Sequence, residues 1–466
     1  MPDMHPTSRL ALATLVCSTA TAQATWSLLY PPTSPPPRYE AAMASLGEDG
    51  PVVLFSGRPP VIQPNAGFLQ DAWLLQGNTW TPMPGPLPPA REGAAMAYDV
   101  RRNLLVLFGG FTIGSGLRGD TWLYDGNQWQ PGPSGPSARR NHAMAYDPIH
   151  MTIVMFGGVV PGFPGGYPQD TWECSGGSWS QIPPQANGPS PRAWNLMAFD
   201  AVNGKVLLHG GALQSAVSGP QDILYNDTWL YDGQIHQWQQ AQPASAPPPR
   251  IGGAIAADLE RGRVIVHGGE LANDYPWEWN GQNWSLRVEA CPSARSKHSM
   301  AFDEPGHRLV MFGGVTNSGS PTTDLWAFGS QFPTTTARYG TGCSGSAGVP
   351  KLDNRLFSYP WIGETYTSEV QRVPQGSVPV FFATGFAATA NSLAAVGMPG
   401  CSQYVAPLVS DLRIANNGRA TWDLSIPNST AMIGLQLYQQ ALVLSPGSNA
   451  AGVIASNGLD LRVGSR

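Results

Sequence analysis

The hexapeptide VMFGGV occurs twice in this chain, at residues 154–159 and again at residues 310–315. Four looser copies of it read VVLFSG at 52–57, LVLFGG at 105–110, VLLHGG at 206–211 and VIVHGG at 264–269. The final glycines of the six copies lie 45 to 58 residues apart, about 51 on average. A period near fifty is typical of propeller blades, whereas helical solenoids repeat over about 20 to 47 residues.

A strict spacing surrounds each copy. An arginine that follows a proline-rich run precedes the first position of the glycine doublet by 18 residues in all six copies: Arg38, Arg91, Arg139, Arg192, Arg250 and Arg295. In five copies an aspartate lies eight residues after the arginine: Asp99, Asp147, Asp200, Asp258 and Asp303. Because an aspartate that heads a tight turn can bond its own backbone, this pattern predicts a strand, a hairpin turn and a second strand that ends in Gly-Gly.

The second half of each repeat is looser and then regular again. A tryptophan follows the second glycine after 8 to 18 residues: Trp73, Trp122, Trp172, Trp229, Trp277 and Trp326. In four copies another tryptophan follows seven residues later, as in DTWLYDGNQW at 120–129. Asp-Gly and Asn-Gly between such pairs are hairpin dipeptides. Each repeat therefore predicts four antiparallel strands, A to D, with a long variable loop between strands B and C.

The last copy lacks the second tryptophan, and the N-terminal part of the chain offers a replacement. Trp26 lies twelve residues before Arg38, a spacing that matches strand D of the other copies. We expect residues 25–30 to form strand D of the last blade. Such a strand closes the ring of sheets and removes an exposed edge.

These residues resemble the kelch repeat, whose marks are an arginine before strand A, a glycine doublet after strand B and aromatic residues in strands C and D. The resemblance covers residues 25–332 and implies an all-β, six-bladed kelch β-propeller similar to the central domain of galactose oxidase. Ser56 in place of the first glycine, and His209 and His267 in the phenylalanine position, depart from the pattern.

The repeat ends before the last part of the chain. Residues 333–338 are expected to be a linker, and residues 339–466 show alternating stretches such as TWDLSI, which predict a small C-terminal β-sandwich. Cys343 and Cys401 are its only cysteines and lie in similar glycine-rich settings, so we expect them to form a disulfide. This segment resembles a C-terminal domain of secreted planctomycete-type bacterial proteins, a family that implies no activity.

The N-terminus predicts export. Arg9, an apolar run at 10–16 and small residues up to Ala24 have the order and length of a signal peptide over residues 1–24. We expect a protein that is secreted, periplasmic or at the cell surface, with no transmembrane segment. The net charge is −5 and the chain has only three lysines, so there is no basic footprint for nucleic acid. We expect a monomer.

An aspartate lies two or three residues before each strand C tryptophan. We interpret the repeated arginines and these aspartates as structural ion pairs, because residues that recur in every blade are expected to stabilise each blade. A ligand site should lie where the copies differ on the same face. The predicted ligand-binding residues there are Tyr39, Glu92, Phe111, Arg140, Trp194, Tyr225, Glu270 and Lys297, which are expected to line a pocket at the mouth of the central channel. Aromatic platforms with a few charges suit polar, ring-shaped ligands such as sugars.

The sequence favours a binding protein for a glycan or protein ligand over an enzyme. A copper oxidase of the galactose oxidase type would need two histidines, two tyrosines and a linked cysteine, and no such set is found, so no metal, cofactor or catalytic residue is assigned. The alternative is a carbohydrate-active enzyme, similar to exported six-bladed sugar mutarotases, which needs only a general acid and base. Glu40, Glu92 or Glu270 could supply that function.

Overall fold

The computed structural model describes residues 24–465, except 48–49, 61–66, 163–165, 176, 214–222, 271–274, 289–290 and 330–333. The expected signal peptide therefore lies almost entirely outside the described residues. Strands dominate the described part of the chain, which confirms the all-β propeller class, and two one-turn 3-10 helices, η1 (Ala394–Val396) and η2 (Thr430–Met432), are its helical elements. None of its helices is long and apolar enough to cross a membrane.

The described part of the repeat region contains six four-stranded antiparallel sheets, each of which we call a blade. Blade one has β2 (Ala42–Ser45), β3 (Val52–Phe55), β4 (Ala72–Gln76) and β5 (Thr79–Pro82); blade two has β6 (Ala95–Asp99), β7 (Leu104–Phe108), β10 (Thr121–Tyr124) and β11 (Trp129–Pro131). Blade three has β12 (Ala143–Asp147), β13 (Thr152–Phe156), β14 (Thr171–Ser175) and β15 (Ser178–Gln181); blade four has β16 (Leu196–Asp200), β17 (Lys205–His209), β20 (Thr228–Asp232) and β21 (Gln237–Ala241). Blade five has β22 (Ala254–Asp258), β23 (Arg263–His267), β24 (Trp277–Trp279) and β25 (Trp284–Leu286); blade six has β27 (Ser299–Asp303), β28 (Arg308–Phe312), β30 (Leu325–Gly329) and β1 (Thr25–Leu29).

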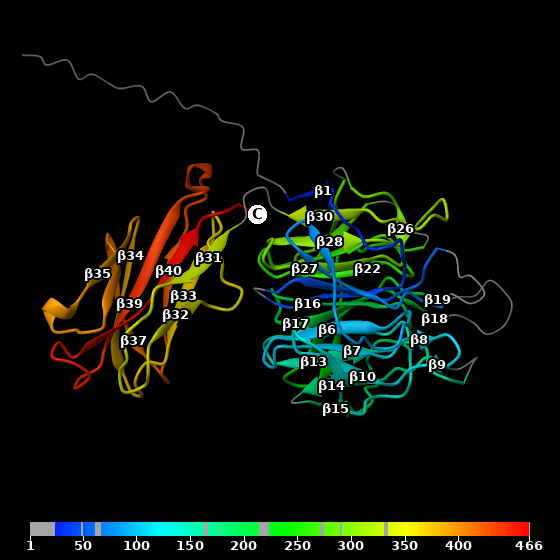
Figure 1. Cartoon of the computed structure of the whole chain (residues 1–466), viewed down its shortest axis with the longest axis horizontal. Helices are drawn as coiled ribbons and strands as arrows, with labels where there is room; N and C mark the ends of the chain where they lie inside the picture. Colours follow the sequence, from blue (N-terminus) through cyan, green and yellow to red (C-terminus); the bar gives the residue numbers. More distant parts are fainter. Residues whose placement is uncertain are drawn as a thin grey trace, which may run out of the picture.

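The blades close into a ring, which Figure 1 shows from the side. Their first strands contact one another in the cycle β2, β6, β12, β16, β22, β27 and back to β2. Strand β1 pairs antiparallel with β30, with Trp26 opposite Phe328, and so completes blade six from the opposite end of the repeat region. This is the pairing that the spacing from Trp26 to Arg38 predicts.

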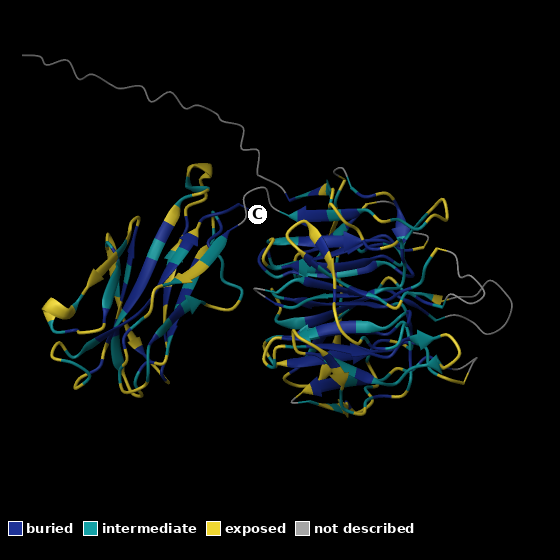
Figure 2. Cartoon of the chain, viewed as in Figure 1, coloured by how far each residue is buried: buried dark blue, intermediate teal, exposed yellow. Residues whose placement is uncertain are grey.

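The core of the propeller lies between blades rather than under one face of a sheet. The second strand of each blade is buried on both faces, as in β7, where Leu105 to Phe108 are inaccessible to solvent. Figure 2 shows these inner strands in the colour of buried residues, while exposed residues gather on the loops. Neighbouring blades pack face to face, so strand B reads as a continuous apolar run such as LLVLF.

Short two-stranded ladders lie on the face that carries the B to C loops. They are β8 (Phe111–Thr112) with β9 (Gly116–Leu117), β18 (Ala212–Leu213) with β19 (Ile223–Leu224), and β26 (Arg295–Ser296) with β29 (Val315–Thr316). The last of these joins the repeat arginine Arg295 and the residue after it to the two residues that follow a glycine doublet. The loops on this face are therefore held by backbone pairing beyond the blades themselves.

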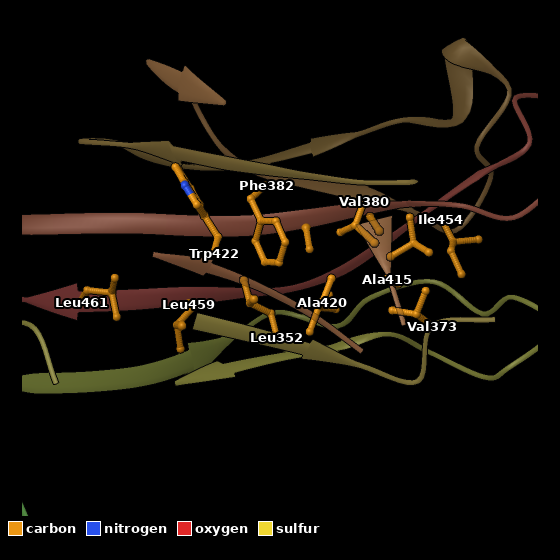
Figure 3. Close-up of a cluster of buried hydrophobic side chains, with 14 of the residues drawn as sticks. Leu352, Val373, Val380, Phe382, Ala415, Ala420, Trp422, Ile454, Leu459 and Leu461 are labelled. Carbon is orange, nitrogen blue, oxygen red and sulfur yellow. The ribbon is translucent and has the colours of Figure 1, made fainter. Parts of the chain in front are cut away.

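The C-terminal part folds as a β-sandwich. Residues 335–338, which were expected to belong to a linker at 333–338, instead form part of a strand of its large sheet. Its five-stranded sheet runs in the order β31 (Thr335–Tyr339), β40 (Val453–Arg462), β39 (Gln436–Leu444), β34 (Val378–Gly385) and β37 (Val409–Ala415). Its three-stranded sheet contains β32 (Lys351–Asn354), β33 (Thr365–Gln371) and β38 (Ala420–Ser425), and β35 (Ala388–Ser392) pairs with β36 (Ser402–Val405). Figure 3 shows side chains of both sheets, among them Phe382 and Trp422, meeting in one core.

The predicted disulfide between Cys343 and Cys401 is present in this domain. The backbone N–H of Cys343 also donates to the carbonyl of Ala455 on β40, at 2.9 Å. The disulfide thus ties the segment before β36 to the segment before β32, which is hydrogen-bonded to β40 of the large sheet.

One loop of the C-terminal domain, residues 355–361, touches the propeller on the face of the A to B turns. The indole N–H of Trp361, which is buried, donates to the backbone carbonyl of Glu260 at 2.8 Å. The ring of Phe357 packs against that of Phe199, with 5.5 Å between centroids. The C-terminal domain therefore docks at the end of the propeller opposite the B to C loops.

Candidate functional site

The repeated arginines are structural, as their presence in every blade suggests. Arg139 is fully buried and forms a two-pronged ion pair with Asp170, at 2.8 Å for each prong. Its Nη1 also donates to the carbonyl of Gly157, 18 residues later, at 3.0 Å. Equivalent pairs are Arg38–Asp71, Arg91–Asp120, Arg192–Asp227 and Arg295–Asp324. The fixed spacing of 18 residues follows because the guanidinium must reach the first carbonyl of the doublet.

The tryptophan of strand C completes this unit. The indole N–H groups of Trp73, Trp122, Trp172, Trp229 and Trp326 each donate to the aspartate two residues earlier. Arg250 is also buried and donates to the carbonyl of Gly268. Asp274, its expected partner, lies outside the described residues.

We expect these ion pairs to make the protein sensitive to acid. Burial alone would raise the pKa of Asp120, but its hydrogen bonds and ion pair with Arg91 outweigh this and lower the pKa to about 2; the pair with Arg295 lowers that of Asp324 to about 2 as well. A carboxyl whose folded pKa is depressed stabilises the fold above its unfolded pKa, about 4, and loses that contribution as pH falls towards 2.

Urea unfolding followed by tryptophan fluorescence should therefore give a midpoint that falls between pH 4 and pH 2 in the wild type. Asp324→Asn should show a lower midpoint at neutral pH and a shallower fall with acid. An unchanged acid profile for this variant would contradict the assignment.

The candidate site begins one residue after each repeat arginine. At this position the backbone bridges to the residue that follows the glycine doublet: Tyr39 with Arg58, Glu92 with Phe111, Arg140 with Val159, Ala193 with Ala212, Ile251 with Glu270 and Ser296 with Val315. Five of the predicted ligand-binding residues, Tyr39, Glu92, Phe111, Arg140 and Glu270, are therefore held by the same backbone pairing on one face of the propeller.

The next residue of each blade forms what we call the rim ring: Glu40, Gly93, Asn141, Trp194, Gly252 and Lys297. Backbone hydrogen bonds link five of its six neighbouring pairs: Gly93 N–H to Glu40 O, Asn141 to Gly93, Trp194 to Asn141, Lys297 to Gly252 and Glu40 to Lys297, at 2.5 to 3.1 Å. All six residues have positive φ, between 54° and 65°. For a bulky residue such as Trp194 this backbone is rare and strained, and the inter-blade hydrogen bonds hold it in place.

Around this ring lies a set of ion pairs that we call the charged network: Glu40, Arg58, Glu92, Arg140, Glu270 and Lys297. Glu92 is buried; its Oε1 accepts from Arg140 at 2.8 Å, and its Oε2 lies 3.6 Å from Arg58. The ammonium of Lys297 lies 2.9 Å from Glu270 and 3.8 Å from Glu40. Blades one, two, three, five and six each contribute to this network.

Burial and the neighbouring charges shift the pKa values of residues in and beside the charged network. Burial raises the pKa of Glu40, and the nearby Glu92 carboxylate raises it further, against the opposing effect of Lys297. Burial would lower the pKa of Lys297, but its hydrogen bond to Glu270 and the charge of Glu40 leave it raised. Burial likewise raises the pKa of Tyr39 despite the charge of Arg58. A carboxyl held near a second one in a partly dry site is suited to exchange protons or to accept hydrogen bonds from a ligand.

Aromatic side chains adjoin these charges. The guanidinium of Arg140 lies over the ring of Phe111, 5.2 Å from its centroid, and that of Arg58 lies 5.8 Å from the centroid of Tyr39. Trp194 is half-buried as a residue, and its indole nitrogen is buried without a hydrogen-bond partner among the described residues. The predicted stacking residue is thus partly accessible rather than enclosed between blades.

Tyr225 takes a different place from the other predicted residues. Its ring stacks on the guanidinium of Arg192, 3.8 Å from the centroid, so its side chain covers a structural arginine. The structure thus joins six of the eight predicted residues through the network and its aromatic neighbours, places Trp194 on the ring, and separates Tyr225.

A pocket in the described part of the chain lies away from the rim ring. It has a volume of about 250 Å³ between blades three and four and is lined by Asp170, Thr171, Pro183, Gln185 and Trp238, among others. Asp170 and Thr171 already serve the fold, through Arg139 and the indole of Trp238. This pocket is therefore not the concave pocket expected at the channel mouth.

Four histidines of the repeats, His142, His209, His267 and His298, are buried in the blades. Burial lowers the pKa of His142 and of His209 to about 3, so both are neutral near pH 7. His267 and His298 contact each other at 3.3 Å. Within the described ranges, no group of three or more His, Cys, Asp or Glu side chains has a metal-binding arrangement.

Comparisons with known proteins support the kelch resemblance over part of the chain. The family described as KLHDC2/KLHL20/DRC7 Kelch-repeats domain matches residues 126–280. The dynein alpha chain of the flagellar outer arm of Chlamydomonas reinhardtii is 26% identical over 195 residues, which are 39% of this chain and 4% of that protein. This chain thus matches only a small part of the length of that relative. The solved structure of YjhT is similar at 17% identity and a TM-score of 0.45, over 63% of this chain and 96% of that one.

Arg58 and Asn141 are among the residues of the site that were not selected from the sequence. Arg58 directly follows Ser56 and Gly57, which occupy the positions of the glycine doublet in blade one. Phe111 and Glu270 follow the doublets of their own blades in the same way, so the same alignment could have found Arg58. Asn141 lies two residues after Arg139, the position shared by all members of the rim ring. The signal for both was the fixed offset from the repeat arginine.

Proposed function

We propose that this chain is an exported binding protein whose propeller holds a glycan or a protein segment at the rim ring. The observation that carries this proposal is the charged network around a hydrogen-bonded ring of backbone. Repeat positions that differ from blade to blade converge here, while the repeated Arg–Asp units keep the blades in place. The kelch match supports a fold that can serve as a binding scaffold. Because one fold hosts many functions, the ligand has to be argued from the residues of the site.

The chemistry of the site suits a polar ligand. Carboxylates of Glu40 and Glu270 and the ammonium of Lys297 offer acceptors and donors at fixed positions. Trp194 offers an aromatic surface beside them. Hydroxyl groups can donate to the carboxylates and accept from the cation, and a sugar ring can stack on the indole, which is the combination that supports a glycan.

We expect Trp194→Ala to weaken ligand binding about tenfold, which corresponds to about 1.4 kcal/mol, because a stacking surface is lost. The ligand is to be found by screening the full-length exported protein on a glycan array and against peptide arrays, and its affinity measured by calorimetry. Tyr30→Ala is the matched control, since Tyr30 is 79% exposed and follows β1 at the outer edge of blade six.

Equal affinities for the wild type and Trp194→Ala, with the fold intact by circular dichroism, would show that the rim ring is not part of the ligand-binding site. Asp147→Asn offers a second comparison, because Asp147 is buried in the A to B turn of blade three and accepts the backbone N–H of Ile149. Its replacement should change stability and leave the affinity of the folded protein unaltered.

The alternative, an enzyme that acts on carbohydrate, is favoured by one observation, the raised pKa of Glu40. A protonated carboxyl beside a lysine could transfer a proton to or from a sugar oxygen. Anomeric exchange of any reducing sugar that binds, measured by NMR, separates the two functions. Exchange that is accelerated by the wild type and lost in Glu40→Gln, with binding retained, would establish the enzyme; binding without acceleration supports the binding protein.

A further inference from the structure

The five-stranded sheet of the C-terminal domain ends in a strand with one partner. Within the described residues, β37 is the last strand in the order β31, β40, β39, β34 and β37, and its register pairs Phe381 with Leu412 and Pro379 with Ile414. An edge strand offers a row of backbone donors and acceptors to another strand. In Figure 1, β37 and β34 belong to the sandwich, whose contact with the propeller is made by the loop at 355–361.

The outer side of this edge is apolar and exposed. Phe381 is 46% exposed, and Leu412 and Ile414 are each 51% exposed. Cross-strand neighbours on one face of a sheet form a continuous surface. These three side chains therefore make an apolar strip that runs up to the edge of the sheet.

The inner side of the same strand carries two opposite charges. Asp411 and Arg413 alternate with Leu412 and lie opposite Phe382 and Val380, which are in the core. Their side chains are 37% and 45% exposed, and they form an ion pair at 2.5 Å. Charges that point inwards on an edge strand oppose pairing in any register that leaves them unmatched.

One register of pairing matches both charges. If β37 pairs antiparallel with β37 of a second copy about a twofold axis through Leu412, Asp411 of each copy lies opposite Arg413 of the other. A twofold axis through Asp411 or through Arg413 would instead place like charges opposite each other, which is destabilising. The sequence Ser410 to Ile414 is thus self-complementary in charge about its central leucine.

We propose that two copies of this protein associate through β37, forming one continuous ten-stranded sheet centred on Leu412. The two apolar strips of Phe381, Leu412 and Ile414 then adjoin across the axis, and the four charges alternate in sign. A second copy fits this edge because its own β37 supplies the complementary pattern. An interface between identical patches related by a twofold axis is the commonest form of protein oligomer. The proposed dimer differs from the monomer expected from the sequence.

The test uses charge reversal in the full chain. Asp411→Arg places two arginines on each strand, and Arg413→Asp places two aspartates, so each variant repels itself in the proposed register. Sedimentation velocity at about 0.1 mM, a concentration at which even a modest interface is occupied, should show a dimer for the wild type and monomers for both variants. An equimolar mixture of the two variants should sediment as a dimer again, because every arginine then faces an aspartate.

Arg419→Asp is the control, since it makes the same change of charge as Arg413→Asp at an exposed residue that closes the turn after β37 and pairs with Glu369. It should remain dimeric. A monomeric wild type, dimers in both single variants, or a mixture that stays monomeric would each overturn the proposal. Formation of a dimer by the mixture also shows that both variants are folded, because each supplies half of the interface.

Discussion

Replacing Arg139 by methionine should lower the free energy of unfolding by about 3 to 5 kcal/mol, the range for breaking a buried ion pair by removing one partner. The guanidinium is fully buried, and its loss removes two hydrogen bonds to Asp170 and one to the carbonyl of Gly157. Methionine retains most of the aliphatic volume, so the change reports the lost charge and hydrogen bonds. Urea unfolding monitored by tryptophan fluorescence measures it.

Arg118→Met is the matched control for this prediction. Arg118 is 29% exposed in its side chain and lies 3.6 Å from Asp120, a contact of the surface type. Such pairs contribute about 0 to 1 kcal/mol. Similar losses for Arg118→Met and Arg139→Met would show that the repeat arginines are not the anchors of the blades.

Replacing Cys343 and Cys401 together by serine should destabilise the C-terminal domain by about 4 kcal/mol, because the disulfide closes a loop of 58 residues in the unfolded chain. Hydrogen exchange of β40 measures this effect directly, since the backbone of Ala455 on that strand bonds to Cys343. We expect exchange there to become faster by up to about a thousandfold, the factor that corresponds to this free energy.

Reduction of the wild type with dithiothreitol should reproduce the exchange of the double variant and have no further effect on that variant. Cys174, which is buried in blade three, takes no part in a disulfide, so reduction has no bond to break there. The strands of the propeller should therefore keep their protection from exchange in every case. Equal protection of β40 with and without the disulfide would mean that the two sheets of the sandwich hold this strand without it.

The elements of the propeller were predictable because each blade repeats a local pattern. Strand B, the aspartate turn and the glycine doublet occupy a span of fixed length, and the structure shows why: the guanidinium of Arg91 must reach the carbonyl of Gly109. The pairing of β1 with β30 was also visible in one spacing, from Trp26 to Arg38. A long-range contact could be foreseen here because one blade lacked a strand that another segment supplied.

The candidate site was foreseen only as a list of residues on one face. Arg58 of blade one and Arg140 of blade three reach Glu92 of blade two from either side. These contacts depend on the length of the side chains and on closure of the ring of blades. Neither of these leaves a periodic pattern in the sequence. For the same reason Tyr225 could not be separated from the others, although its ring lies on Arg192.

The sequence by itself determined the repeat, the four strands of each blade, the structural arginines, the strand that completes the last blade, and the disulfide. All of these depend on spacings along the chain or on the presence of a single pair of cysteines in a domain. Only the tertiary structure decided that Glu40, Trp194 and Lys297 belong to one hydrogen-bonded ring, that Trp361 docks the C-terminal domain on Glu260, and that β37 is an edge. The physical reason is that these features come from contacts between distant segments, whose geometry is set by how complete blades and sheets pack and not by the residues next to them.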